Sequence, residues 1–304
     1  MSFSSNTKSE ICKIKTYNFI KKKYQMYGML LFSKSFSYES IVLTTKQLCV
    51  KDIIVNLITE LTGSIVDVFS RGVSKTRVNN DFVISIPNKC DRIRIINEFY
   101  KDFNYIDNKI VLNKNIDKNI IHFLRGVFLT CGAITNPNIN YRLEFIIENK
   151  LLVVFLKDVL LNVKNIFFNI HTTLRKEQYV LYIKESESIA DFLTYIGASV
   201  SSMELMQVKM LKEVINYVNR TTNFQTANLC KTATAAAIQI DAIENIKNEV
   251  GLDFLQNDLK ELAQLRLENP DMSLRELGEL LSIPLSRSGV NHRLKRIIEI
   301  SKDI

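Results

Sequence analysis

The sequence is poor in the residues that build metal sites and disulfide frameworks. It has only five cysteines and three histidines among 304 residues. The cysteines are scattered and never form a Cys-x-x-Cys pair, whereas a structural zinc site needs ligands in paired local spacing. We therefore expect no metal and no cofactor. The isolated thiols also fit a reducing compartment better than a secreted protein.

Long apolar runs and nucleotide-binding loops are also missing. The longest apolar stretch, residues 151–156, is followed by Lys157 and Asp158 and is far too short to cross a bilayer. The first residues contain no apolar segment of the kind that directs secretion. Neither Gly-x-Gly-x-x-Gly nor a Gly-Lys-Ser/Thr loop occurs. These absences predict a cytoplasmic protein with no membrane partner.

The net charge of +8 is unevenly distributed along the chain. Residues 1–197 hold 27 basic against 18 acidic side chains, residues 198–251 hold 5 of each, and residues 252–304 hold 8 against 9. The N-terminal part therefore has a general attraction to polyanions. Solvated surface lysines explain the same excess equally well, because charge alone does not locate a site.

The first 197 residues repeat one order of elements, helix–strand–helix–strand–strand–helix. β-branched and aromatic runs predict the strands, and apolar spacings of three and four predict the helices. In the first copy, about residues 1–105, the predicted helices are 17–32, 46–61 and 91–103, and the strands are 41–44, 64–69 and 81–86. In the second, about residues 106–197, the helices are 118–129, 151–161 and 188–196, and the strands are 140–147, 164–170 and 178–183. This pattern predicts an α+β fold with two pseudo-symmetric halves.

Beyond residue 198 the pattern is entirely helical. A helix is predicted over residues 203–218, and the polar run 219–223 is expected to end it. We interpret residues 198–222 as a helical linker and residues 223–304 as an all-α domain. That domain is expected to begin with a long helix over residues 225–250, capped by Gly251, and to continue with a helix over residues 257–268.

The segment from Ser273 to Ile304 has the pattern of two amphipathic helices joined by a short turn at Pro284. Ser273 and Glu276 form a capping box that begins the first helix. Ser286 is expected to cap the second helix, which carries no acid before Glu299. The predicted apolar faces are Leu274, Leu277, Leu280 and Leu281 on the first helix, and Val290, Leu294, Ile297 and Ile298 on the second.

The polar face of the second helix carries the side chains that read DNA. Arg pairs with guanine and Asn with adenine, while Lys and Arg also reach phosphates. Because the first residues of a recognition helix point at base edges, we assign the earlier polar positions to bases and the later cations to phosphates. The predicted DNA-binding residues are Ser286, Arg287, Ser288, Asn291, His292, Arg293, Lys295 and Arg296. A solvated basic face on a terminal helix is the plainer alternative.

Residues 124–132, LRGVFLTCG, resemble the LAGLIDADG signature helix of homing endonucleases. In that family two such helices pack along a pseudo-twofold axis, and each ends in an acidic residue that holds a divalent metal. The matching segment of the first copy is residues 26–34, MYGMLLFSK, so that Gly28 corresponds to Gly126. The metal positions would be Ser33 and Cys131, and neither is the carboxylate that a hard divalent ion requires. The resemblance implies a catalytically degenerate LAGLIDADG-like domain over residues 1–197 and no enzymatic activity.

The chain as a whole resembles the WhiA family of bacterial transcription regulators, which join a degenerate LAGLIDADG-like domain to a C-terminal helix-turn-helix. The resemblance is carried by residues 124–145, 182–198, 218–232, 262–281 and 286–297. It implies a cytoplasmic, nucleoid-associated protein that binds double-stranded DNA. It also implies a role in cell division and chromosome segregation, and in sporulation in some relatives. The chain departs from the family at Phe224-Gln225, where a Cys-Glu pair is expected.

Two other functions fit the residues less well. A basic N-terminal domain without catalytic acids is compatible with a protein-interaction adaptor, in which that domain binds a transcription or cell-division protein and DNA binding is secondary. An active homing-type endonuclease ranks lower, because it needs acidic residues at the ends of both signature helices.

Overall fold

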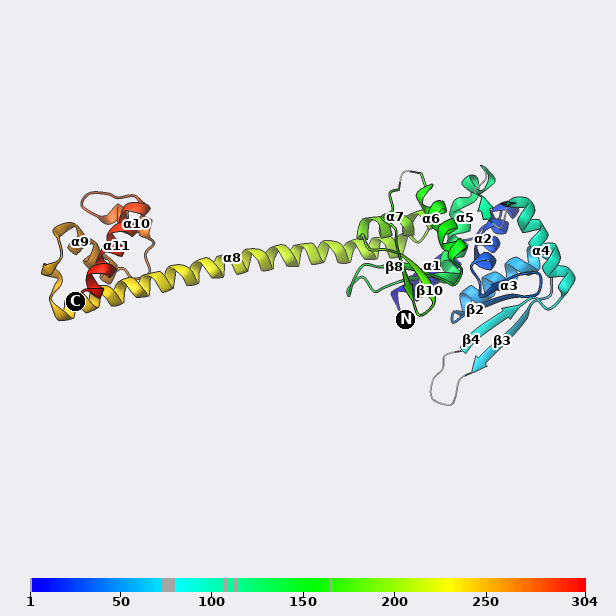
Figure 1. The fold of residues 1–304 in the computed structure, drawn as a ribbon, viewed down its shortest axis with the longest axis horizontal. Coiled ribbons are helices and arrows are strands. Elements are labelled where there is room, and N and C mark those ends of the chain that lie inside the picture. The colour runs from blue at the N-terminus through cyan, green and yellow to red at the C-terminus, as the bar shows by residue number, and fades with distance from the viewer. Residues whose placement is uncertain (1, 73–79, 107–108, 112–113, 165) are drawn as a thin grey trace. The chain divides into compact units, whose positions relative to one another are not determined.

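The chain forms two compact units in a computed structural model (Figure 1), which we call unit 1 (Met1–Lys212) and unit 2 (Glu213–Ile304). The structure describes residues 2–72, 80–106, 109–111, 114–164 and 166–304. Unit 1 combines helices and sheets, whereas the described secondary structure of unit 2 is helical. None of the helices in these ranges combines the length and the apolar character that a membrane crossing needs.

Unit 1 contains two halves, each with a four-stranded antiparallel sheet and the same strand order. The sheets run β1-β2-β4-β3 and β7-β8-β10-β9. The first half comprises α2 (Phe19–Leu31), β1 (Ser35–Phe36), β2 (Ile41–Thr45), α3 (Leu48–Thr62), β3 (Asp67–Gly72), β4 (Asn80–Ser85) and α4 (Lys89–Asp102). The second comprises α5 (Lys114–Cys131), β7 (Gly132–Ile134), β8 (Leu143–Ile147), α6 (Lys150–Leu161), β9 (His171–Arg175), β10 (Gln178–Ile183) and α7 (Ser186–Ile196). The matching order confirms the predicted duplication and the α+β class.

Three features of unit 1 differ from the sequence-based expectation. Helix α1 (Phe3–Cys12), capped by Ser2, and the hairpin of β5 (Asn104–Ile106) and β6 (Lys109–Val111) were not predicted. The edge strands β1 and β7 were also missed, because two or three residues are too short to show alternation. The prediction of a strand over residues 164–170 is wrong, because residues 164 and 166–170 form no strand. Asn165 lies outside the described residues. The strand is β9, which pairs with β10 through a two-residue turn at Lys176 and Glu177.

The two signature helices α2 and α5 pack against each other so closely that glycine is required at the contact. A Cβ atom on Gly28 would lie 2.2 Å from the Phe123 carbonyl oxygen, and one on Gly126 would lie 2.1 Å from the Gln25 carbonyl oxygen. Both distances are far below any real Cβ contact, so each glycine admits the backbone of the opposite helix. This geometry confirms that Gly28 and Gly126 are equivalent. We call this contact the α2–α5 seam.

Helix α8 (Ser199–Glu249) is continuous, so the break predicted at residues 219–223 is wrong. The segment from 199 to 249 contains neither proline nor glycine, and asparagine and threonine in a helix can simply face solvent. At its N-terminus the Glu10 carboxylate accepts hydrogen bonds from the Val200 and Ser201 amides, at 2.7 and 3.0 Å. Helix α1 therefore satisfies backbone donors of α8 that the helix itself leaves unpaired.

The C-terminal part of unit 2 packs four helical segments around one core. After η1 (Leu252–Phe254), these are α9 (Asn257–Glu268), α10 (Leu274–Leu280) and α11 (Arg287–Lys302), packed against the end of α8. The core includes Ile243, Ile246, Leu259, Leu262, Leu277, Leu281, Val290, Leu294 and Ile297. Leu280 was predicted to be buried but is 51% exposed. Leu281, which was also predicted to be buried, lies in the core and ends the helix in an extended conformation.

Candidate nucleic-acid interface

Helix α10 begins at the predicted capping box. The Ser273 hydroxyl accepts from the Glu276 amide at 3.3 Å, and the Glu276 carboxylate accepts from the Ser273 amide at 2.8 Å. The hydrogen bond from the Ser273 backbone is also the main cause of the lowered pKa of Glu276. Just before this cap, the buried Arg266 of α9 donates to the Met272 carbonyl at 2.8 Å. The start of α10 is therefore fixed from both sides.

The turn between α10 and α11 is held by a glycine contact and by a side chain of α9. The Leu285 amide donates to the Gly278 carbonyl at 3.0 Å, and a Cβ on Gly278 would lie 2.3 Å from the Leu285 carbonyl oxygen. The Glu261 carboxylate accepts from the Ser282 hydroxyl at 2.6 Å and from its amide at 2.7 Å. These bonds, the hydroxyl first, lower the pKa of Glu261. The turn therefore presents α11 at a fixed angle to α10.

Helix α11 is capped by Ser286, whose hydroxyl accepts from the Gly289 amide at 3.3 Å. Its inner face is Val290, Leu294 and Ile297, all buried, while Ile298 is half-buried. On the outer side, spacings of four residues align two polar rows, because residues four apart are neighbours on a helix surface. The rows are Arg287, Asn291 and Lys295, and Ser288, His292 and Arg296. Asn291 is half-buried, and the other five are exposed, as is Ser286.

Arg293 differs from the other predicted DNA-binding residues. Its guanidinium Nε lies 3.3 Å from the Asp258 carboxylate of α9, and its side chain is only 26% exposed. It also donates to the Asp258 carbonyl at 3.4 Å. Arg293 thus ties α11 to α9. The outer rows keep three cations, Arg287, Lys295 and Arg296, on a helix without an acid before Glu299.

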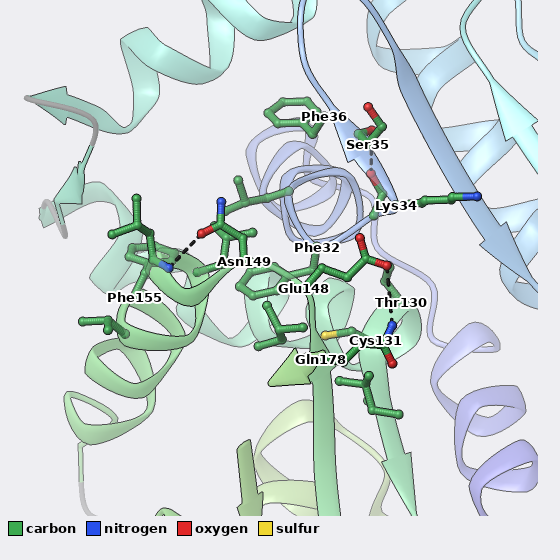
Figure 2. A pocket seen from close by; sticks show the side chains of 18 of the residues that line it. Phe32, Lys34, Ser35, Phe36, Thr130, Cys131, Glu148, Asn149, Phe155 and Gln178 are labelled. Carbon is green, nitrogen blue, oxygen red and sulfur yellow. Dashed lines mark hydrogen bonds between the residues drawn. The ribbon is translucent and has the colours of Figure 1, made fainter. Parts of the chain in front are cut away.

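Ser33 and Cys131, the positions that the LAGLIDADG resemblance assigns to a metal, line a cavity of about 800 Å³ between the two halves of unit 1 (Figure 2). The Ser33 hydroxyl donates to the carbonyls of Leu30 and Ser35, at 2.6 and 3.0 Å. The Cys131 thiol donates to the Val127 carbonyl at 3.4 Å, and burial raises its pKa to about 12. Both side chains are therefore uncharged near neutral pH and provide no anionic oxygen for a hard cation.

A lysine places a positive charge at the end of α5. The Lys8 ammonium group of α1 donates to the Leu129 carbonyl at 3.0 Å, close to Cys131. Burial lowers the pKa of Lys8 to about 8. The described residues hold no group of three Asp, Glu, His or Cys side chains that could bind a metal ion. A cationic amine beside an uncharged thiol disfavours a divalent metal still further.

Sequence reasoning missed residues that shape both regions. Arg266 and Glu261, both on α9, hold the helix-turn-helix through bonds to Met272 and Ser282. Both partners lie in turns, and no periodic sequence pattern indicates that a helix residue bonds to a turn. Glu148 lines the cavity at the end of β8 and accepts from the Gln178 side chain at 3.5 Å (Figure 2). Its position directly after a strand is the one sequence signal that pointed to it.

Two family models match the chain and together cover more than half of it. One is described as "WhiA LAGLIDADG-like domain" and matches residues 120–215. The other is described as "WhiA C-terminal HTH domain" and matches residues 218–301. The second match covers α9, α10 and all but the last residue of α11, with every predicted DNA-binding residue, and so confirms the predicted helix-turn-helix.

Curated relatives match over the full length. "Probable cell division protein WhiA" from Thermoanaerobacter sp. (strain X514) is 37% identical over 316 residues, covering 100% of this chain and 98% of the relative. The protein of the same name from Clostridium botulinum (strain Hall / ATCC 3502 / NCTC 13319 / Type A) is 35% identical over 324 residues, covering 100% and 99%. The crystal structure of full-length DUF199/WhiA from Thermatoga maritima is 26% identical, with a TM-score of 0.60 and coverage of 100% and 99%.

Proposed function

This chain belongs to the WhiA family, and we propose that it is a site-specific DNA-binding regulator of cell division and chromosome segregation that acts at the nucleoid. The observation that carries the proposal is the outer side of α11. Two rows of polar side chains lie there, all exposed except the half-buried Asn291, with three cations and no acid before Glu299. The relatives' name, a probable cell division protein, supports the biological role.

Within this proposal the residues of α11 divide by role. Arg287, Ser288 and Asn291 lie in the first turns, where side chains of recognition helices reach base edges. Lys295 and Arg296 lie further along and contact phosphates, which fix the register without reading sequence. Ser286 and His292 flank the base-reading positions. Arg293, in its pair with Asp258, orients the helix.

The test separates base reading from phosphate binding. Genome-wide mapping of bound sites gives a specific duplex, and fluorescence anisotropy then compares it with a scrambled duplex. We expect Arg287→Ala to weaken specific binding by about 1–3 kcal/mol and to have little effect on the scrambled duplex. Lys295→Ala should weaken both equally and reduce the salt dependence by about one unit of slope.

A matched control removes a charge elsewhere in unit 2. Lys247 is exposed in the last turn of α8 and belongs to neither outer row of α11, so Lys247→Ala should leave both affinities close to wild type. Equal small losses for Arg287→Ala, Lys295→Ala and Lys247→Ala would contradict the assignment of α11 as the reading helix.

We further infer that the protein does not cleave DNA. Hydrolysis by homing endonucleases requires carboxylates at the ends of the signature helices, and here those ends carry Ser33 and Cys131. Incubation of the purified chain with a plasmid library and Mg²⁺ should leave the DNA intact at all times sampled. Magnesium-dependent cleavage that is lost together with unit 1 would refute this.

The adaptor function is the second candidate, favoured by the +9 charge of residues 1–197. A chain lacking residues 1–197, checked for helix content by circular dichroism, distinguishes the two roles of that part. Unchanged DNA affinity with failed regulation in cells would indicate a protein partner for unit 1. A large loss of DNA affinity would indicate that unit 1 also binds DNA.

A further inference from the structure

The cavity between the two halves of unit 1 is large enough to hold a small molecule. Its volume of about 800 Å³ lies in the range of ligand pockets, whereas protein interiors are otherwise close-packed. It is lined by the end of α2 with β1, by the end of α5 with β7, and by the end of β8 with α6 (Figure 2). Because both halves build its walls, the cavity is a feature of the assembled unit 1.

The buried part of the lining, which we call the floor, is apolar and largely aromatic. Its main residues are Leu31, Phe32, Phe99, Ile147 and Phe155. At the exposed part of the lining, which we call the rim, Leu151 and Val154 of α6 are each 52% exposed. Covering apolar surface of this kind is favourable, and aromatic rings add specific face and edge contacts. The cavity therefore fits a ligand with an apolar or aromatic body.

The rim carries two carboxylates, those of Glu148 and Asp158, and one ammonium group, that of Lys34. Figure 2 shows Glu148 projecting into the cavity, while the Lys34 side chain extends away from it. The Glu148 carboxylate accepts a long bond from the Gln178 side chain at 3.5 Å. In the described part of the chain neither carboxylate belongs to an ion pair. The mouth of the cavity therefore has a net negative charge that no cation of these residues neutralises.

Several other polar groups of the lining are already used to hold the walls together. The Ser33 hydroxyl bonds to two carbonyls, as described above, and the Thr130 hydroxyl donates to the Met29 carbonyl at 3.2 Å. The Asn149 side chain accepts from the Leu151 amide at 2.8 Å and so caps α6. The two rim carboxylates are thus the groups best placed to bind the polar end of a ligand.

We propose that this cavity binds a small organic cation, in which an ammonium group is carried on an apolar or aromatic body. The body lies on the floor, and the ammonium group lies at the rim beside Glu148 and Asp158, where nearby aromatic rings also favour a cation. An anionic ligand meets like charge there. A divalent metal ion fits poorly, because the described residues offer no group of three ligands. The cavity lies wholly within unit 1, so this binding does not depend on the role of α11.

The first test compares three probes that share one body and differ in charge: phenylbutylamine, phenylbutanol and phenylbutyrate. Isothermal titration calorimetry of the full chain should give a dissociation constant of about 0.1–1 mM for the amine, as expected for a ligand of this size. Phenylbutyrate should bind at least about tenfold more weakly, because it exchanges attraction to two carboxylates for repulsion. The neutral alcohol should lie between them. Equal affinities for all three probes would overturn the proposal.

The second test removes the charges of the rim. Glu148→Gln and Asp158→Asn should each weaken the amine by about three- to fivefold and leave the alcohol unchanged, because each removes one partly exposed attraction. In the double variant, the amine and phenylbutyrate should bind within about twofold of each other. Glu204→Gln is the matched control, since Glu204 is an exposed carboxylate of unit 1 outside the lining, and it should change none of the affinities.

The third test fills the cavity from either half. Thr44→Trp on β2 and Ala133→Trp on β7 each place a large ring at the lining and should abolish binding of all three probes. Calorimetry of each variant verifies that unit 1 still unfolds cooperatively.

Three further results would overturn the proposal. These are a wild-type chain that binds none of the probes, an amine that still binds both filled variants, or an amine affinity that the rim variants leave unchanged. Displacement of the amine by about 5 mM Mg²⁺, beyond the effect of NaCl at equal ionic strength, would assign the carboxylates to a metal ion instead. None of these measurements involves DNA, so amine binding can fail while α11 still reads its site, and the converse also holds.

Discussion

The α2–α5 seam and the α10–α11 turn both depend on glycine for a close approach of two backbones, but they leave opposite surfaces exposed. At the seam, Cβ atoms on Gly28 or Gly126 would lie 2.1–2.2 Å from a carbonyl oxygen of the other helix, and at the turn the distance for Gly278 is 2.3 Å. The seam buries both helix faces and ends in the uncharged side chains of Ser33 and Cys131. The turn instead presents the polar rows of α11 to solvent. Equally close backbone contacts thus bury two helices in unit 1 and hold a solvent-exposed polar helix in unit 2.

The largest effect is expected at the seam. Gly126→Val places three carbon atoms where the backbone of α2 lies, and a backbone cannot move aside as a flexible side chain can. We expect unit 1 to lose about 3 kcal/mol or more and to unfold at a lower temperature in calorimetry. The unfolding transition of unit 2 should stay in place. An unchanged unfolding temperature of unit 1 in this variant would show that the two helices can move apart without loss of stability.

The corresponding change in unit 2 should abolish DNA binding. Gly278→Val forces the turn away from α10, so we expect a loss of about 2 kcal/mol in the stability of unit 2 and no measurable specific binding. Gly289→Ala is the matched control, because its Cβ would meet Leu285 at an ordinary 3.6 Å. Calorimetry and anisotropy on the same samples separate the two effects. Normal binding by Gly278→Val would show that the turn does not set the position of α11.

A smaller effect is expected at the start of α10. Ser273→Ala removes a cap hydroxyl and should cost about 1 kcal/mol in the stability of unit 2. Ser273→Asp supplies another capping oxygen and should restore most of that loss. Chemical denaturation followed by circular dichroism measures both. Equal stability of the alanine and aspartate variants would argue against capping as the role of Ser273.

The smallest effect depends on pH and lies beside the seam. Burial, helped by the charges of Arg125 and Lys21, lowers the pKa of His122 from 6.5 to about 4. The unfolded chain therefore binds a proton at His122 between pH 6.5 and 4 while the folded chain does not, and stability falls as pH falls through that window. Urea midpoints at several pH values should show a shallower decline for His122→Gln. The exposed His292→Gln in unit 2 should leave the unit 1 transition unchanged.

Much of the fold could be predicted from local patterns. The apolar spacing and turn residues located β10 and α9 at their observed bounds, and the capping box located α10. The hairpin before β10 escaped prediction because Lys176 and Glu177 adopt positive φ angles of 48° and 64°, which sequence patterns expect of glycine or asparagine. A turn of this kind is recognised only in the structure, where β9 and β10 pair on either side of it.

Apart from the packing of the two signature helices, which the family resemblance implied, longer-range contacts could not be predicted. The sequence indicated which side of α11 faces outward, because its apolar residues recur at helical spacing. It could not indicate that Arg293 would pair with Asp258 of α9, 35 residues away. It also gave the wrong result at residues 219–223, where polar residues that often cap a helix continue one. Whether such residues stop a helix depends on what surrounds them.

The carboxylate of Glu10 at the beginning of α8 links protein synthesis to folding. Its hydrogen-bond partner Ser201 lies 191 residues later in the chain, so α1 emerges from the ribosome long before that partner exists. During synthesis the Glu10 carboxylate of α1 lacks these amide donors until about two thirds of the polypeptide has been translated. The completion of unit 1 is thereby tied to the synthesis of the helix that leads into the helix-turn-helix.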